Sequence, residues 1–270
     1  MAPNVYRPRL LIDATPEPGV RLRLERAFGL AAKLGGDITG ACFAWPASEI
    51  KDALLGNPAS MEFRTKELEG AIATTEAIRD DVAGQTGVRP EWLCGLSAPE
   101  DALIDAALLT DLLITSVPQS SVCAVADPAA IALRSGAPVL RLGDRWASHT
   151  LDHVVLAWKD AREARAALMG ATPVLALSAR VTVAGVGDEV TLERLDAVAA
   201  YLNHRGLNAT ARHLPARESV HRSLLHYLQQ EGWPLIVAGA RGRGLWTERL
   251  FGGVTRELLD SSDASWLLAT

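Results

Sequence analysis

The C-terminal stretch Pro234-Leu-Ile-Val-Ala-Gly-Ala-Arg-Gly-Arg-Gly244 carries the pattern that decides the fold. Its apolar residues 235–238 predict a buried strand that runs into a glycine-rich loop. A helix is predicted to begin near Gly252, and the apolar residues 266–268 predict a last strand. A strand that leads through glycines into a helix presents backbone N–H groups without internal partners, and such groups suit a phosphate.

The candidate anion site is built around this loop. Glycines let a ligand approach the main chain, while arginines add positive charge and a threonine adds a hydroxyl group. The candidate binding residues of the loop are Ala238, Gly239, Arg241, Gly242, Arg243, Gly252, Gly253, Val254 and Thr255. The sequence has no G-x-x-x-x-G-K-[ST] motif, and the order Gly239, Gly242, Gly244 reverses that of the dinucleotide fingerprint.

The composition argues against a nucleic-acid-binding, disulfide-stabilised or membrane-spanning protein. The chain has 270 residues, of which 49% are hydrophobic and 22% charged, as is ordinary for a globular protein with a large core. A formal net charge of -5 gives no basic footprint for nucleic acid. Three scattered cysteines predict thiols, not a disulfide framework. Because neither a signal peptide nor an apolar membrane span is visible, we expect a cytoplasmic protein without a membrane partner.

Outward from the C-terminal stretch, the chain divides into two halves with the same plan. Strands are predicted at residues 10–12, 38–45, 88–96, 111–115 and 138–142, and again at 153–158, 181–186, 209–214, 235–238 and 266–268. Helices are predicted between them, at residues 20–34, 62–83, 99–108, 128–134, 161–177, 191–204 and 218–230. Strands that alternate with helices favour parallel sheets joined by crossovers. We therefore predict an α/β protein with two tandem open parallel five-stranded sheets flanked by helices, in domains 1–143 and 151–270.

The glycine spacing Gly239-x2-Gly242-x9-Gly252, followed by Gly253-Val254-Thr255, resembles the universal stress protein family. Nucleotide-binding members of that family carry G-x2-G-x9-G-[ST] after the fourth strand of the domain. Gly253 departs from this pattern, since a small hydroxyl residue is expected there, whereas Thr255 matches the hydroxyl two positions later. The resemblance covers nearly the whole chain as two domains, and it implies a Rossmann-like fold of the adenine nucleotide alpha hydrolase type.

The resemblance also implies how the halves differ. Family domains pair through their last strands, so we expect an internal pseudo-dimer in which the strands of Val139 and Trp266 meet. In the family, an aspartate after the first strand reaches the adenine. The first half has Asp13 but no glycine loop, so we expect it not to bind. The second half has Lys159 at the expected aspartate position, with Asp160 beside it. Because lysine accepts no hydrogen bond, a weak or altered base preference is predicted.

These observations predict a regulatory module of a stress response that binds ATP or another adenine nucleotide, with or without Mg²⁺, in its second half. The module would act through an unidentified protein partner, and further association into a homodimer is left open. One alternative is a nucleotide-free interaction protein whose loop is a relic. Another is a slow ATPase in which Glu248 or Asp160 positions water. An enzyme is less expected, because no constellation of acid, base and metal ligand is visible.

Overall fold

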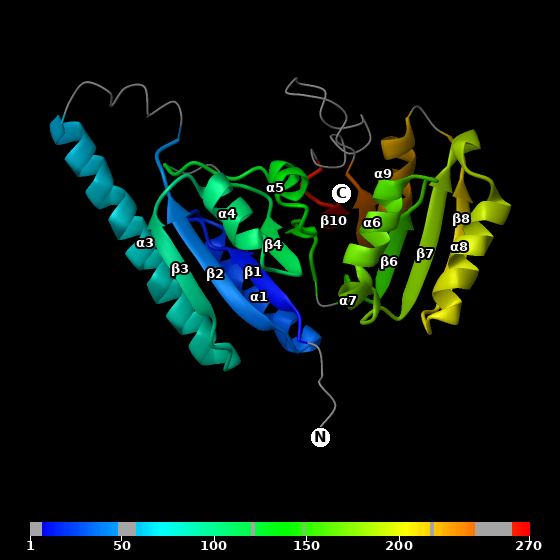
Figure 1. Cartoon of the computed structure of the whole chain (residues 1–270), viewed down its shortest axis with the longest axis horizontal. Coiled ribbons are helices and arrows are strands. Elements are labelled where there is room, and N and C mark those ends of the chain that lie inside the picture. The colour runs from blue at the N-terminus through cyan, green and yellow to red at the C-terminus, as the bar shows by residue number, and fades with distance from the viewer. Residues whose placement is uncertain (1–6, 48–57, 120–121, 148, 217–218, 241–260) are drawn as a thin grey trace. The chain divides into compact units, whose positions relative to one another are not determined.

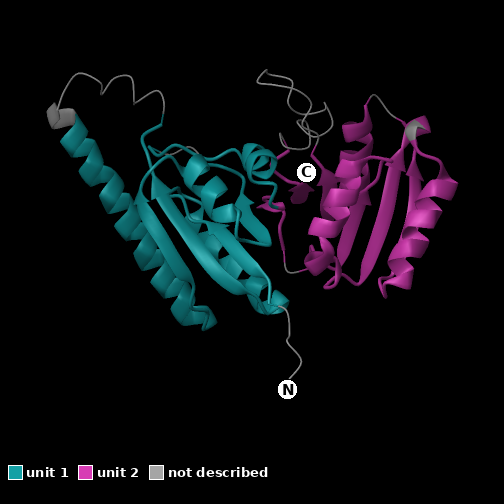
Figure 2. Ribbon diagram, viewed as in Figure 1, with its two compact units in different colours: residues 1–137 teal, residues 138–270 magenta. Residues whose placement is uncertain are grey.

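The computed structural model describes residues 7–47, 58–119, 122–147, 149–216, 219–240 and 261–270 (Figure 1). The chain divides into two compact units, Met1–Ala137 and Pro138–Thr270, called here the first and the second unit (Figure 2). The predicted helix near Gly252 and most of the glycine loop fall within residues 241–260, outside the described residues.

The first unit contains a parallel sheet with the strand order β3-β2-β1-β4. Its helices form two pairs, because α1 packs against α3 and α4 packs against α5. The chain moves from β1 to β2 to β3 in one direction along the sheet, and it then crosses back to β4 on the other side of β1. Because right-handed crossovers in opposite directions lie on opposite faces, the two helix pairs cover opposite faces of the sheet. The elements are β1 Arg9–Asp13, α1 Val20–Leu34, β2 Asp37–Ala44, α3 Pro58–Thr86, β3 Glu91–Leu96, α4 Pro99–Ala107, β4 Leu112–Ser116 and α5 Pro128–Ser135.

The second unit repeats this plan in β8-β7-β6-β9 and adds two strands, β10 and β5, in the order β5-β10-β9-β6-β7-β8. Strands β10, β9, β6, β7 and β8 are parallel, and β5 is antiparallel to β10. The elements are β5 Val139–Leu142, β6 His153–Ala157, α6 Arg162–Gly170, α7 Thr172–Leu175, β7 Arg180–Val186, the 3-10 turn η1 Gly187–Glu189, α8 Leu192–His204, β8 Ala209–Leu214, α9 Val220–Gln230, β9 Leu235–Gly239 and β10 Trp266–Ala269.

The pairing of β5 with β10 confirms the expectation that the strands of Val139 and Trp266 meet. Val139 pairs with Leu268, and Arg141 pairs with Trp266. Every residue of both strands is buried, and the Arg141 guanidinium lies 5.0 Å from the centre of the Trp266 ring. Strand β5 therefore belongs to the second unit by its contacts, although it closes the first half of the sequence pattern.

All ten predicted strands are present. Strands β1, β4, β6 and β9 are apolar runs buried on both faces of the sheet, whereas β3 and β8 have several exposed residues. Two helices differ from the prediction. The helix predicted at residues 62–83 is longer, Pro58–Thr86. The helix predicted at residues 161–177 divides into α6 and α7. Helix α7 begins at Thr172, and Pro173 in its first turn has no N–H to continue α6.

Candidate functional site

The topology places the expected site at the carboxyl ends of β6 and β9. These strands are neighbours in the second unit, and the connections that follow them leave in opposite directions, β6 toward β7 and β9 toward β10. In open α/β sheets, ligands bind in the crevice formed at such a point. Of the predicted loop residues, Ala238 and Gly239 end β9 at this place. Arg241, Gly242, Arg243, Gly252, Gly253, Val254 and Thr255 lie outside the described residues.

Gly239 has a packing role at the end of β9. A Cβ atom at this position would lie 2.4 Å from the carbonyl carbon of Glu163 and 2.7 Å from the backbone nitrogen of Ala164. The first turn of α6 therefore sits directly against the end of β9, and only a residue without a side chain fits there. The next residue, Ala240, donates its backbone N–H to the carbonyl of Ala269 at 2.8 Å, which ties the start of the loop to β10.

Lys159 and Asp160 are exposed and follow β6 directly. The Asp160 carboxylate accepts hydrogen bonds from Nε of Arg194, in the first turn of α8, and from the indole N–H of Trp158, each at 2.9 Å. These two donors lower the pKa of Asp160. The carboxylate is therefore already engaged by protein donors on the β7 side of the sheet.

The pairing register corrects the expected equivalence between Asp13 and Lys159. Asp13 is the last residue of β1 and pairs with Ala41, whereas Ala157 is the last residue of β6 and pairs with Ala184. Ala157 is thus the counterpart of Asp13, and Lys159 lies two residues further on. The apolar run of the second half continues through Trp158, one residue past the end of β6. For this reason the sequence comparison matched Asp13 with Lys159 instead of Ala157.

The carboxyl end of the first sheet is filled by a buried polar cluster, which we define as Asp13, Glu17, Arg23, Thr115 and Ser116. Arg23 donates from Nη1 to the carbonyl of Asp13 at 2.8 Å and from Nε to Ser116 Oγ at 2.9 Å. It also forms ion pairs with Glu17 and, at 3.2 Å, with Asp13. Thr115 donates its hydroxyl to Asp13 Oδ2 at 2.8 Å.

Burial dominates the electrostatics of this cluster. The side chains of Arg23 and Glu17 are each 1% exposed, and that of Asp13 is 6% exposed. Burial lowers the pKa of Arg23, and the charge of Asp13 opposes that change. Because buried charges require partners, the three groups stabilise one another as a set. Asp13, which the family resemblance assigns to a nucleotide, is instead satisfied by Arg23 and Thr115.

The second unit has small residues at every position of this cluster. The registers of β1 with β4 and of β6 with β9 relate Thr115 and Ser116 to Ala238 and Gly239. The buried positions of α1 and α6 follow the same spacing, which relates Arg23 to Ala167. The counterparts of Asp13, Glu17, Arg23, Thr115 and Ser116 are Ala157, Ala161, Ala167, Ala238 and Gly239. Among the described residues of the second unit, no ionic cluster occupies these five positions.

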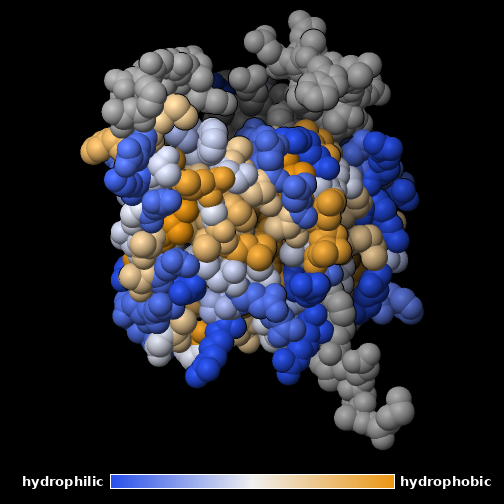
Figure 3. All heavy atoms as spheres, turned by 60° about the vertical axis from the view of Figure 1, so that its left-hand side comes forward, coloured by the Kyte–Doolittle hydropathy of each residue, from blue (hydrophilic) through white to orange (hydrophobic). Residues whose placement is uncertain are grey.

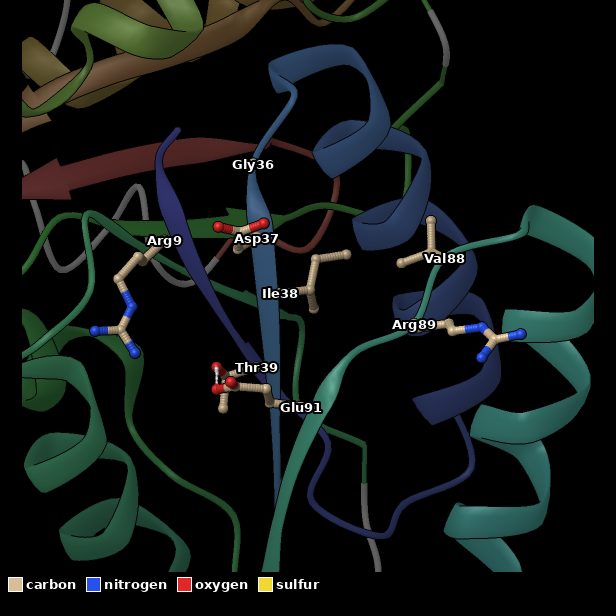
Figure 4. A pocket seen from close by; sticks show the side chains of 8 residues that line it. All are labelled: Arg9, Gly36, Asp37, Ile38, Thr39, Val88, Arg89 and Glu91. Atoms are coloured by element: carbon tan, nitrogen blue, oxygen red, sulfur yellow. Dashed lines mark hydrogen bonds between the residues drawn. The ribbon is translucent and has the colours of Figure 1, made fainter. Parts of the chain in front are cut away.

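Two hollows lie at the opposite ends of the strands. The hollow in the first unit has a volume of about 600 Å³ and lies where β1, β2 and β3 begin (Figure 4). Thr39 and Glu91 point toward each other there, whereas Arg9 and Arg89 point in opposite directions, so no cations converge on an anion. A hollow of about 430 Å³ occupies the corresponding place in the second unit. Neither hollow coincides with the carboxyl-end site that the topology favours.

Sequence reasoning missed the buried cluster, although one signal was present. Arg23 interrupts the apolar face that Leu24, Ala27, Phe28 and Ala31 give to α1, and a charged residue on such a face requires a buried partner. Within the described part of the chain, no three His, Cys, Asp or Glu side chains are placed to hold a metal ion. Among the same residues, no helix is sufficiently long and apolar to cross a membrane.

Known structures share this fold. A universal stress protein from Archaeoglobus fulgidus DSM 4304 matches with a TM-score of 0.74 and 14% identity, over 97% of this chain and 96% of that one. A putative universal stress protein from Pseudomonas aeruginosa UCBPP-PA14 matches with a TM-score of 0.53 and 13% identity, over 97% and 93% of the two chains. A functionally unknown protein from Pseudomonas aeruginosa PAO1 gives 0.52 and 13%, over 96% and 92%.

No family model and no curated protein matches the sequence. At these identities the similarity concerns the fold. It confirms the α/β architecture and the likeness in fold to universal stress proteins that the glycine spacing suggested.

Proposed function

We propose that the second unit binds an adenine nucleotide through its phosphates at the carboxyl ends of β6 and β9, as a regulatory module of a stress response. The observation that carries this proposal is the contrast at those strand ends. Where the first unit is filled by a buried ionic cluster, the second has Ala157, Ala161, Ala167, Ala238 and Gly239. The glycine-rich sequence after Gly239 supplies backbone N–H groups suited to phosphate, and the fold gives the crevice.

The described residues fit the phosphate end of a nucleotide better than its base end. Lys159 is exposed two residues beyond the end of β6 and carries a positive charge, which attracts phosphate. Ala157 offers no acceptor for an exocyclic amino group, and the carboxylate of Asp160 is engaged by Arg194 and Trp158. We therefore expect weak discrimination between adenine and other bases. A bound triphosphate would bring Mg²⁺ through its own oxygens.

The first unit acts as a structural partner in this proposal and binds no nucleotide. The Arg23 guanidinium supplies there the positive charge that the carboxylates of Asp13 and Glu17 require. A ligand would have to displace this buried set, and each group left without a partner would cost several kcal/mol, on the order of 3–5. Binding should therefore be limited to one nucleotide per chain.

The test combines two measurements on the full chain. Mass spectrometry of the denatured purified protein detects co-purified nucleotide, and melting temperatures are measured with increasing ATP, ADP, AMP and GTP. We expect the melting temperature to rise with ATP concentration, because a ligand that binds only the folded state stabilises it. The shift with GTP should be similar.

A pair of glycine substitutions separates binding from folding. Gly252→Val introduces a side chain into the proposed phosphate loop and should remove the ATP shift while changing the melting temperature of the free protein little. The matched control, Gly84→Val, alters an exposed position of α3 in the first unit where an added Cβ meets open space, so it should keep the shift. If the wild-type protein shows neither bound nucleotide nor a shift, the nucleotide-free interaction protein is the better interpretation.

A further inference from the structure

Cys42 and Cys94 lie side by side on neighbouring strands of the first unit. They are register partners in the parallel pair β2 and β3. Neighbouring parallel strands are about 4.8 Å apart, and in-register side chains point to the same face of the sheet. A disulfide spans Cα separations of about 4.4–6.8 Å, so the backbone already provides a suitable separation for an S–S bond.

The same helix contacts both thiols. Cys94 donates its S–H group to Glu76 Oε1 of α3 at 3.7 Å, and Cys42 lies next to Thr75 of α3. Burial raises the pKa of Cys42 to about 12, and the neighbouring Cys94 and Glu76 add to the increase. Burial and Glu76 also raise the pKa of Cys94, an effect that Arg79 opposes. Both groups are therefore protonated thiols at neutral pH, and they react slowly.

Access distinguishes the two thiols. Cys42 is fully buried, whereas Cys94 is exposed on β3, which has β2 as its only partner among the described strands of the first unit. Figure 3 brings the side of the molecule that carries α3 and β3 toward the viewer, and apolar patches there alternate with charged ones. Leu93 and Leu96, on either side of Cys94, are 44% and 39% exposed. A small reagent can thus reach Cys94, whereas Cys42 is accessible only to the neighbouring Cys94.

We propose that Cys94 and Cys42 form a slowly exchanging dithiol pair. A low-molecular-weight disulfide such as oxidised glutathione is reduced by the pair, and an intrachain Cys42–Cys94 disulfide is formed. Cys94 first loses its proton to solvent, and its thiolate attacks one sulfur of the small disulfide. A mixed disulfide forms on Cys94, and the other half leaves as a thiolate that takes up a proton. Cys42 then loses its proton and attacks the sulfur of Cys94, and the second half leaves and is protonated in the same way. Two cysteine S–H bonds are lost, one S–S bond is gained, and the oxidant leaves as two thiols.

The pair is a property of the first unit alone. The positions of Cys42 and Cys94 correspond in the second unit to Gly185 and His213, which are register partners on β7 and β8. The third cysteine, Cys123, is buried and lies in a bridge with Pro46, outside the sheet. It therefore shows whether a buried thiol outside the pair is also oxidised.

The test uses the native full chain incubated with an excess of oxidised glutathione. After alkylation and digestion without reductant, peptide mass spectrometry should find Cys42 linked to Cys94 and Cys123 alkylated, and titration of the denatured protein should show the loss of two of its three thiols. Cys123→Ser should form the same link. Cys94→Ser should leave Cys42 as a thiol, since Cys42 has no access to the reagent.

Three results would overturn the proposal. One is a glutathione adduct that persists on Cys94 while Cys42 stays reduced. Another is a link between Cys94 and Cys123. The third is a chain that keeps all three thiols under conditions in which a denatured sample is fully oxidised.

Discussion

The two sheets share a backbone plan, but the side chains at the carboxyl ends of their strands differ in charge and size. In the first unit, Arg23 sits between two carboxylates and two hydroxyl groups; in the second, four alanines and a glycine occupy the same places. In open α/β sheets, this end of the strands is where ligands bind. The difference shows that one backbone plan can hold a buried ionic cluster in one unit and small side chains at the matching positions of the other.

The strongest way to break this comparison is to remove the central cation of the first unit. Arg23→Ala leaves Asp13 and Glu17 buried without a partner, and the free energy of unfolding should fall by about 3–5 kcal/mol. Urea unfolding measures the loss, and hydrogen exchange should place it in the amides of β1 and not in those of β6.

The matched variant gives the first unit the alanines of the second. The triple change Asp13→Ala, Glu17→Ala and Arg23→Ala removes all three charges together, so it should be more stable than Arg23→Ala alone. A triple variant that unfolds at lower urea concentration than the single one would contradict the view that the charges act as one set.

A smaller effect is expected where the units differ by one side chain. Ser116 ends β4 with a side chain, but its counterpart Gly239 has the backbone of Glu163 at 2.4 Å from an added Cβ. Gly239→Ala should therefore lower the stability of the second unit by about 1–3 kcal/mol. Gly29→Ala, in α1 where an added Cβ meets nothing, should be neutral or stabilising by up to about 1 kcal/mol. Equal losses in both variants would argue against close packing at Gly239.

The last difference concerns pH and the first residues of β1 and β6. Arg9 is exposed, whereas its counterpart His153 is buried and bonds Thr182 Oγ1 through Nε2 at 2.9 Å. Burial and the charge of Arg180 lower the pKa of His153 from 6.5 to about 4, and Glu231 opposes the change. Between these values the unfolded chain binds more protons, so the stabilising effect of neutral His153 is present above pH 6.5 and is lost as the pH falls toward 4.

Melting temperatures across this pH range test the prediction. The wild-type protein should lose more stability on acidification than His153→Gln, which cannot gain the proton. Parallel pH profiles for the two proteins would mean that His153 does not titrate as its burial requires.

The sequence predicted the central strands because they are apolar runs that a parallel sheet buries on both faces, as in Leu10 to Ile12 and Leu235 to Ala238. The family resemblance added the pairing of β5 with β10. Register was not predictable, because a strand boundary hidden inside the apolar run before Lys159 moved the match by two residues. The same limit concealed the cysteine pair, since two cysteines far apart in sequence become neighbours only when β2 and β3 are aligned. The loop residues from Arg241 to Thr255 stay a prediction.

The antiparallel pairing of β5 with β10 has a consequence for anyone who wishes to separate the halves. A fragment that starts at residue 151 would omit Val139–Leu142 and leave the hydrogen-bonding edge of β10 bare, which invites self-association. The cut belongs before Pro138. The same pairing also constrains folding during synthesis. Strand β5 leaves the ribosome more than a hundred residues before β10, so this ladder can form only after the end of the chain has been made.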